Sequence, residues 1–196
     1  EIMPSLVGSE MCIRDSIGIE VDKMLSGRDP RYALQLLAQL QLYWVVFMPP
    51  PALSQRMGRS SDHGAHIDEL VHDAPDERAA LSLSDCFDSL LRGTSPLWSR
   101  LPTDWLARVR SPEWRAQRRL VWYAIALYPL RDLYIQAKKQ PAWAGAVTLS
   151  AGLKLGHRTT KDPVTSLVRA ASLLTRPRLA RFVPAPCLTR RSTIGL

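Results

Sequence analysis

The chain has 196 residues, of which 46% are hydrophobic, so it is long and apolar enough for one domain, or two small ones, with a buried core. The charge is uneven: residues 1–99 hold 8 Lys or Arg against 14 Asp or Glu, whereas residues 100–196 hold 18 against 4. Three scattered cysteines exclude a disulfide framework, and no apolar run approaches the roughly 20 residues of a membrane span, so we expect an intracellular protein without a membrane segment.

Residues 1–16 differ from the rest of the chain. They show no sustained helical or strand period and no signal peptide, and they resemble the translated read-through of a sequencing adapter. We therefore expect the native sequence to begin at or near Ile17. We leave residues 1–16 out of the predicted fold and give Cys12 no role.

The segment 17–27 predicts a helix that ends at a glycine. Its apolar residues recur at helical spacing: Val21, Met24 and Leu25. Glu20 and Lys23 lie three apart on one face, where a salt bridge can form, and an ordinary surface pair is the commoner meaning of that spacing. Gly27 suits the left-handed position past a helix end.

A second helix is predicted from Pro30 to Met48. Asp29 offers a cap, and Pro30 fits the first turn, where its missing N–H costs nothing. Leucines at helical spacing form the apolar face, and the prolines at 49–51 end the helix. The helix-turn-helix over 17–51 is thus the first predicted unit.

Residues 54–66 are polar and contain glycine, which predicts a surface loop. Three histidines lie near carboxylates in and after this loop, in the set His63, His66, Asp68, Glu69, His72 and Asp73. Histidine and carboxylate are zinc ligands, but the spacing matches no zinc motif. We therefore predict no metal site, and the role of the loop stays open.

Residues 76–92 predict an amphipathic helix with Gly93 as its stop. Its predicted apolar face consists of Leu83, Phe87, Leu90 and Leu91. Cys86 lies on the same helix and is expected to be a buried structural thiol. No functional site is predicted here.

A basic helix is predicted over 112–128. Proline and an acid stand in its first turn, and its basic edge consists of Arg115, Arg118 and Arg119. Pro129 is expected to kink or stop the helix. It then resumes over 130–139 and ends with Lys138 and Lys139. No β-strand is predicted anywhere in the chain.

A glycine-containing loop is predicted over 152–162, between a short helix over 143–151 and a last helix that begins at Asp162. Its cationic or potentially cationic side chains are Lys154, His157, Arg158 and Lys161. Two glycines and these charges suit a loop that contacts phosphate, with a plain polar connector as the alternative. A basic half of this kind favours a polyanion partner, and nucleic acid comes first.

Three stretches, in this order, resemble class II tRNA nucleotidyltransferases of the eukaryotic and fungal type, the CCA-adding enzymes. They are Gly18-x-Glu20-x-x-Lys23 with its following leucine-rich helix, the Tyr-Pro-Leu step within 118–131, and the Leu-Lys-Leu and Lys-Asp elements within 152–162. The resemblance implies an all-α chain. Residues 17–51 would be the end of the neck, and residues 52–196 a helical body truncated at the C-terminus.

The resemblance also implies a partner and residue roles. Glu20 and Lys23 would brace the helix-turn that supports the nucleotide-selecting helix, and tRNA would be the partner. The expected RNA-binding residues are Arg115, Arg118, Arg119, Lys138, Lys139, Lys154, Arg158 and Lys161. The compartment is not distinguished among cytoplasm, nucleus and mitochondrion.

The parent reaction adds C, C and A to tRNA 3′ ends from CTP and ATP, with two Mg²⁺ ions held by carboxylates of a catalytic head. The family places a Gly-Gly phosphate loop and an Asp-x-Asp pair in that head, and this sequence contains neither. We therefore expect a fragment whose N-terminal catalytic head is missing. It would have no catalytic residue and no cofactor of its own, and would be inactive alone.

Two other interpretations stay open. A non-enzymatic helical scaffold that binds RNA or protein would show the same apolar stripes and basic faces. A fragment of a related poly(A) polymerase would share the helical body, but it fits the Tyr-Pro-Leu and Leu-Lys-Leu stretches less well.

Overall fold

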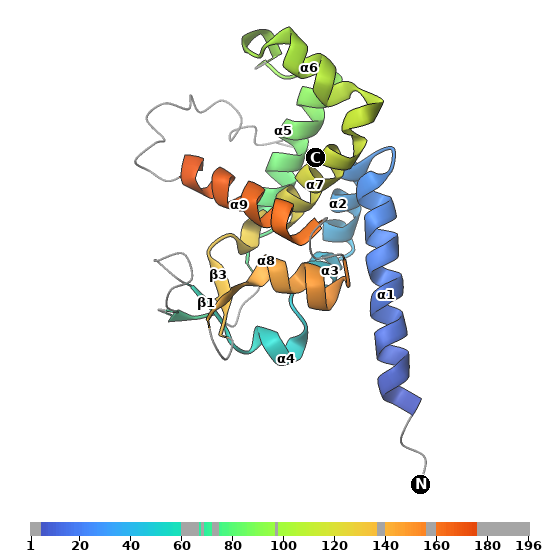
Figure 1. Ribbon diagram of the computed structural model, residues 1–196, viewed down its shortest axis with the longest axis vertical. Helices are drawn as coiled ribbons and strands as arrows, with labels where there is room; N and C mark the ends of the chain where they lie inside the picture. Colours follow the sequence, from blue (N-terminus) through green and yellow to red (C-terminus); the bar gives the residue numbers. More distant parts are fainter. Residues whose placement is uncertain are drawn as a thin grey trace, which may run out of the picture.

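Helices make up most of the described chain in this computed structural model. The residues that it describes are 5–59, 67, 69–71, 75–96, 98–136, 140–155 and 160–175. Their α-helices are α1 (Ser5–Ser26), α2 (Pro30–Gln39), α3 (Tyr43–Phe47), α4 (Pro51–Ser54), α5 (Arg78–Arg92), α6 (Thr103–Arg110), α7 (Arg115–Leu127), α8 (Ala144–Val147) and α9 (Asp162–Thr175). Shorter helical turns are η1 (Trp98–Arg100), η2 (Pro112–Trp114), η3 (Tyr128–Leu130) and the π-turn η4 (Thr148–Gly152). Figure 1 shows α1 along one side and α6 at one end.

The first helix is longer than the sequence predicts. Its backbone is helical from Ser5 to Ser26, so it includes residues that the predicted fold left out. Helix formation is cooperative: once a helix exists, each added residue gains a hydrogen bond, and no proline lies between Ser5 and Ser26.

The turn after α1 is built as predicted at Asp29 but not at Gly27. The Asp29 carboxylate accepts a hydrogen bond from the Tyr32 N–H at 3.0 Å, which caps α2. Gly27 does not have a positive φ. A Cβ there would lie 3.0 Å from the Lys23 carbonyl oxygen, so crowding against the end of α1 favours glycine instead.

The predicted second helix is two helices. α2 ends at Gln39, and Gln41 follows with a φ of 58°. The Leu42 N–H bonds to the Leu37 carbonyl and the Gln41 N–H to the Ala38 carbonyl, which is the Schellman pattern of a helix end. The chain then turns into α3.

A small antiparallel sheet corrects the prediction of an all-α chain. Its strands are β1 (Met57–Arg59), β2 (Glu69–Leu70), β3 (Leu133–Ile135) and β4 (Ala142–Trp143), in the order β2-β1-β3-β4. β3 replaces the helix predicted over 130–139: Gly58 pairs with Tyr134, and Tyr134 with Trp143. Strands of two or three residues are too short to show the alternation that marks a strand.

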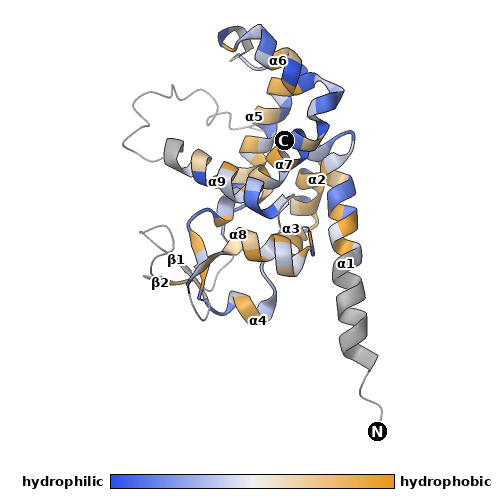
Figure 2. Cartoon of the chain, in the orientation of Figure 1, coloured by the Kyte–Doolittle hydropathy of each residue, from blue (hydrophilic) through white to orange (hydrophobic). Residues whose placement is uncertain are grey.

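The basic helix α7 is also the central helix. Its buried residues are Trp122, Tyr123, Ile125, Ala126 and Leu127. α1, α5 and α9 pack against it, and apolar residues gather where these helices meet (Figure 2). The Tyr43 hydroxyl donates a hydrogen bond of 2.6 Å to the Ala126 carbonyl, which ties α3 to the same core.

The amphipathic helix α5 is confirmed, with a different buried face. Gly93 ends it with a φ of 76°, as the sequence predicts. However, Leu83 is exposed, Ala80 and Ser84 are buried, and Cys86 is half-buried rather than buried. Phe87 and Leu91 of the predicted face do pack against the core, while Asp85 and Asp88 pair with Arg31 of α2.

α9 confirms the predicted last helix. Val164 and Val168 are buried in the core, whereas Leu167, expected on the same stripe, is exposed. Among the helices that the structure describes, none combines the length and the hydrophobicity needed to cross a membrane.

Candidate nucleic-acid interface

Three of the predicted RNA-binding arginines lie together at the start of α7. Arg115 is exposed, whereas Arg118 and Arg119 are half-buried. They share one side of the helix because residues three and four apart lie on the same face. Arg118 donates a hydrogen bond of 3.3 Å to the Arg110 carbonyl, a neutral acceptor, and has no ion pair with a described residue.

Arg119 has a structural partner. Its Nη1 donates to Asp22 Oδ1 at 2.5 Å, and its Nη2 donates to Thr160 Oγ1 at 3.3 Å. The Tyr123 hydroxyl donates to the same Asp22 oxygen at 3.0 Å. We call these four residues the Asp22 junction; it joins α1, α7 and the start of α9. Burial, and then the charge of Asp22, raises the pKa of Tyr123 well above its usual value.

Asp22 was not predicted as a site residue, although its position carries a signal. It lies four residues after Gly18 and three before Leu25, on the side of α1 that faces the core. An acidic residue within an otherwise apolar stripe needs a partner, because burying an unpaired charge is costly. Its partner could not be named from local pattern, since Arg119 is far away in sequence.

The predicted ion pair of Glu20 and Lys23, next to Asp22, joins two residues of the same helix. Lys23 Nζ lies 2.8 Å from Glu20 Oε1, and both side chains are about two-thirds exposed, at 67% and 65%. The ion pair therefore forms as the spacing predicts. Among the described residues, neither side chain forms a hydrogen bond or ion pair with α7, and the role of Glu20 and Lys23 as a brace stays a prediction.

Gly18 marks a close approach between α1 and the segment after η4. A Cβ at Gly18 would collide with the carbonyl oxygen of Leu153. Leu153 is buried, and its neighbour Lys154 is exposed with a φ of 54°. Glycine is thus required where the first and third family-like stretches touch.

The other predicted cations fall into two groups. Lys161 is half-buried, and its carbonyl accepts a hydrogen bond from the Thr165 hydroxyl at 2.8 Å. Lys138, Lys139 and Arg158 lie outside the described residues. The structure therefore brings Arg115, Arg118 and Arg119 together but does not extend that group to every predicted residue.

A pocket of about 520 Å³ opens beside the three arginines. We call it the arginine pocket; its walls come from the α1–α2 turn, the start of α7 and the end of α5. The lining residues are Leu25, Ser26, Gly27, Arg28, Pro30, Leu91, Arg115, Arg118, Arg119 and Trp122. Arg28 was missed by the sequence analysis, because no local pattern connects a turn residue of the acidic half with α7.

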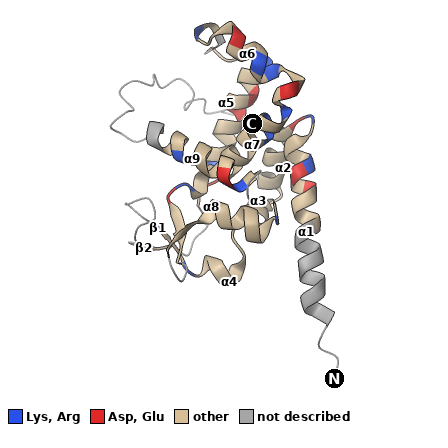
Figure 3. Ribbon diagram, viewed as in Figure 1, with Lys and Arg blue, Asp and Glu red and all other residues tan. Residues whose placement is uncertain are grey.

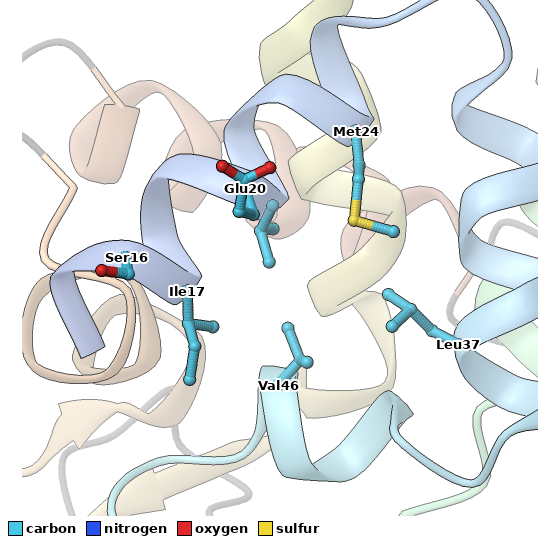
Figure 4. Close-up of a pocket in the computed structure, with 7 residues that line it drawn as sticks. Ser16, Ile17, Glu20, Met24, Leu37 and Val46 are labelled. Carbon is cyan, nitrogen blue, oxygen red and sulfur yellow. The ribbon is translucent and has the colours of Figure 1, made fainter. Parts of the chain in front are cut away.

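A second pocket, of about 450 Å³, is almost entirely apolar. It lies between α1, α2 and α3, and its lining residues are Ser16, Ile17, Glu20, Val21, Met24, Leu37 and Val46. Figure 4 shows Ile17, Met24, Leu37 and Val46 converging on the space. We call it the apolar pocket.

The sequence predicts no metal site among the histidines and carboxylates of residues 63–73. Most of these residues lie outside the described part of the chain: His63, His66, Asp68, His72 and Asp73. Glu69 is described and is exposed on β2. Within the described ranges, no three His, Cys, Asp or Glu side chains gather closely enough to hold a metal ion.

The three stretches that resemble CCA-adding enzymes meet in the structure. Arg119, from the second stretch, bonds to Asp22 of the first and to Thr160 of the third, while Gly18 touches Leu153. Comparison with family models, with curated proteins and with solved structures found no match to this chain.

Proposed function

We propose that this chain is a tRNA-binding helical region of a tRNA nucleotidyltransferase that adds CCA to tRNA 3′ ends. The observation that carries the proposal is the Asp22 junction, where residues from all three family-like stretches bond to one another. If the three stretches belong to one helical body of that family, they are expected to touch, and they do so through side-chain hydrogen bonds. The predicted RNA-binding arginines border the same junction.

The charge of this face supports RNA as the partner. Arg28 and Arg115 are exposed and have no ion pair with any residue that the structure describes, and Arg118 bonds only to a backbone carbonyl. Arginine suits phosphate because its planar guanidinium offers two parallel donors. Contacts of this kind position a nucleic acid backbone without reading its sequence.

In this proposal the chain holds tRNA, and the chemistry belongs to the catalytic head of the parent enzyme. Transfer from CTP and ATP requires Mg²⁺ held by carboxylates, and we assign no described residue to that task. Glu20 and Lys23 keep their proposed role as a brace of the helix-turn. The arginines at the start of α7 then serve to orient the tRNA rather than to activate it.

A competition experiment tests the partner. Labelled tRNA is bound by the full chain at low salt, and unlabelled tRNA or poly(U) is added at equal nucleotide concentration while fluorescence anisotropy is followed. We expect tRNA to compete several times better, because a rigid helical face matches a folded duplex arm better than a flexible strand. Equal competition by poly(U) would reduce the activity to general polyanion binding.

The apolar pocket supports a second candidate, a protein-interaction scaffold. Val45 on α3 is 73% exposed and Ile19 on α1 is 57% exposed, on helices that also line the pocket. Apolar surface of this kind is typical of protein interfaces. In that case tRNA would not bind, and salt would have little effect on the association with the true partner.

A further inference from the structure

The geometry points to the arginine pocket as a binding site for a phosphate group of the RNA backbone, with Arg28 as a ligand-binding residue. The inference rests on the proposed function, which it deepens, because it names one contact point for the RNA. Arg28 is not one of the RNA-binding residues that the sequence predicts. It lies on the turn between α1 and α2 and lines the pocket together with residues of α7.

The lining of the pocket carries a surplus of positive charge. Four of its ten lining residues are arginines, and none is an Asp or Glu. The charge of Arg119 is balanced by Asp22. Arg28, Arg115 and Arg118 have no ion pair with a carboxylate among the described residues, so an anion that enters the pocket relieves their mutual repulsion.

Other arginines of the described chain form ion pairs with carboxylates. Arg31 lies 2.5 Å from Asp85, and Arg92 lies 2.7 Å from Asp88 and 3.3 Å from Asp29. The Arg31–Asp85 pair joins α2 to α5, the Arg92–Asp29 pair joins α5 to the cap of α2, and the Arg92–Asp88 pair lies within α5. Arg31 and Arg92 thus have carboxylate partners, whereas three of the four pocket arginines have none among the described residues.

The pocket has the size and part of the lining that a nucleotide unit attached to that phosphate needs. Its lining includes the apolar side chains of Leu25, Leu91 and Trp122, of which Trp122 is 3% exposed. An apolar wall lowers the local dielectric constant and so strengthens the attraction between guanidinium and phosphate. A volume of about 520 Å³ exceeds that of a phosphate, which leaves room for the adjoining sugar.

Arg28 is a clean position for a test. It is exposed and has no hydrogen bond or ion pair with a described residue, so its replacement should leave the fold intact. Arg78 is the control for the loss of an exposed arginine elsewhere: its side chain is 88% exposed, lies 3.8 Å from Asp76, and is at the opposite end of α5 from Leu91. Thirteen helical residues separate the two ends by about 20 Å.

The experiment compares the full chain with Arg28→Ala and Arg78→Ala in titrations of labelled tRNA at several salt concentrations. We expect Arg28→Ala to weaken binding about 5- to 20-fold at low salt and to reduce the salt slope by about one, as loss of one phosphate contact requires. Arg78→Ala should bind like the unchanged chain. Unfolding midpoints of all three proteins confirm that the folds are equal.

The outcomes separate this inference from the proposed function. If the unchanged chain binds tRNA and Arg28→Ala binds it equally well, the pocket is overturned and the proposed function stands. If the unchanged chain does not bind tRNA, both are overturned. A further arm adds CTP or inorganic pyrophosphate at constant ionic strength: displacement of tRNA at micromolar concentration, lost in Arg28→Ala, would show that the pocket takes a free nucleotide or polyphosphate instead of the RNA backbone.

Discussion

At the scale of single residues, Asp22 determines how α1 is attached to the rest of the molecule. Its carboxylate accepts hydrogen bonds from Arg119 and Tyr123, and its side chain is only one-third exposed, at 33%. Glu20, on the same helix, forms an ion pair of similar length that is mostly solvated. The two acids therefore differ in what their removal should cost.

Replacing Asp22 tests this difference. Asp22→Ala should lower the free energy of unfolding by about 1–3 kcal/mol, because it leaves a half-buried guanidinium and a buried hydroxyl without their acceptor. The control Glu20→Ala should change it by less than about 1 kcal/mol, the usual range of an exposed pair. Urea unfolding monitored by circular dichroism measures both. Equal effects would mean that the junction does not stabilise α1.

Two buried tyrosines link stability to alkaline pH. Burial raises the pKa values of Tyr43 and Tyr123 above the usual value near 10, and neighbouring carboxylates add to the shift. Ionisation is therefore easier in the unfolded chain. The stability that comes from these hydroxyls is complete below about pH 10 and is lost as the pH rises above it.

Tyr43→Phe should make the fall in stability at alkaline pH less steep. The variant loses a buried hydrogen bond to Ala126, so we expect it to be about 1 kcal/mol less stable at pH 8. Its stability should then fall less steeply than that of the unchanged chain between pH 10 and pH 11. Tyr32→Phe is the control, because Tyr32 is 59% exposed. A slope equal to that of the unchanged chain would show that Tyr43 ionises as readily when folded.

At the scale of elements, local signals predicted helices well and tertiary features poorly. The cap at Asp29, the stop at Gly93 and the apolar period of α5 and α9 depend on residues close in sequence, and all are present. The pairing of β1 with β3 joins segments far apart in the chain and leaves no periodic trace. On α5, Asp85 pairs with Arg31 of α2, and Leu83, which was predicted to be buried, is exposed.

The break between α2 and α3 was missed because its left-handed residue is not a glycine. Gln41 occupies the position after the helix end that glycine usually fills, at a φ of 58°. A side chain with a Cβ is strained in that conformation. The sequence therefore carried the apolar pattern of one helix, whereas the backbone forms two.

Gln41→Gly tests the strain at this break. We expect the free energy of unfolding to rise by about 0.5–1 kcal/mol, because glycine adopts a positive φ without a steric penalty. The control Gln39→Gly, in the last turn of α2, should lower it, since glycine costs about that amount within a helix. Thermal and urea unfolding measure the changes. Destabilisation of similar size in both variants would contradict the strain.

The candidate site was predictable only in part, for the same reason. Residues three and four apart on one helix predicted the basic edge of Arg115, Arg118 and Arg119. The assignment of Arg119 to Asp22 and the approach of Arg28 depend on how α1 packs against α7. Both are decided by tertiary contacts that one sequence does not reveal.

At the scale of the whole molecule, the two charge-biased halves of the chain are arranged differently. Several acids of the first half pair with arginines of that same half, as Arg31 does with Asp85 and Arg92 with Asp29. Figure 3 shows Lys and Arg near α6 and around the α1–α2 turn, whereas the ribbon around the strands is mostly uncharged. Of the second half, Arg115 and Arg118 at the start of α7 have no ion pair with a described residue, and these are the charges that the proposed function assigns to RNA.

The most direct test of this arrangement is the salt dependence of tRNA binding by the full chain, measured with Arg115→Glu and the matched charge reversal Arg78→Glu. We predict that the logarithm of the affinity falls linearly with the logarithm of the salt concentration, with a slope of about −2 or steeper. Arg115→Glu should weaken binding at least about tenfold and reduce the slope, whereas Arg78→Glu should change the affinity by no more than about threefold. Binding that does not respond to salt, or equal losses in the two variants, would contradict a tRNA-binding face at the start of α7.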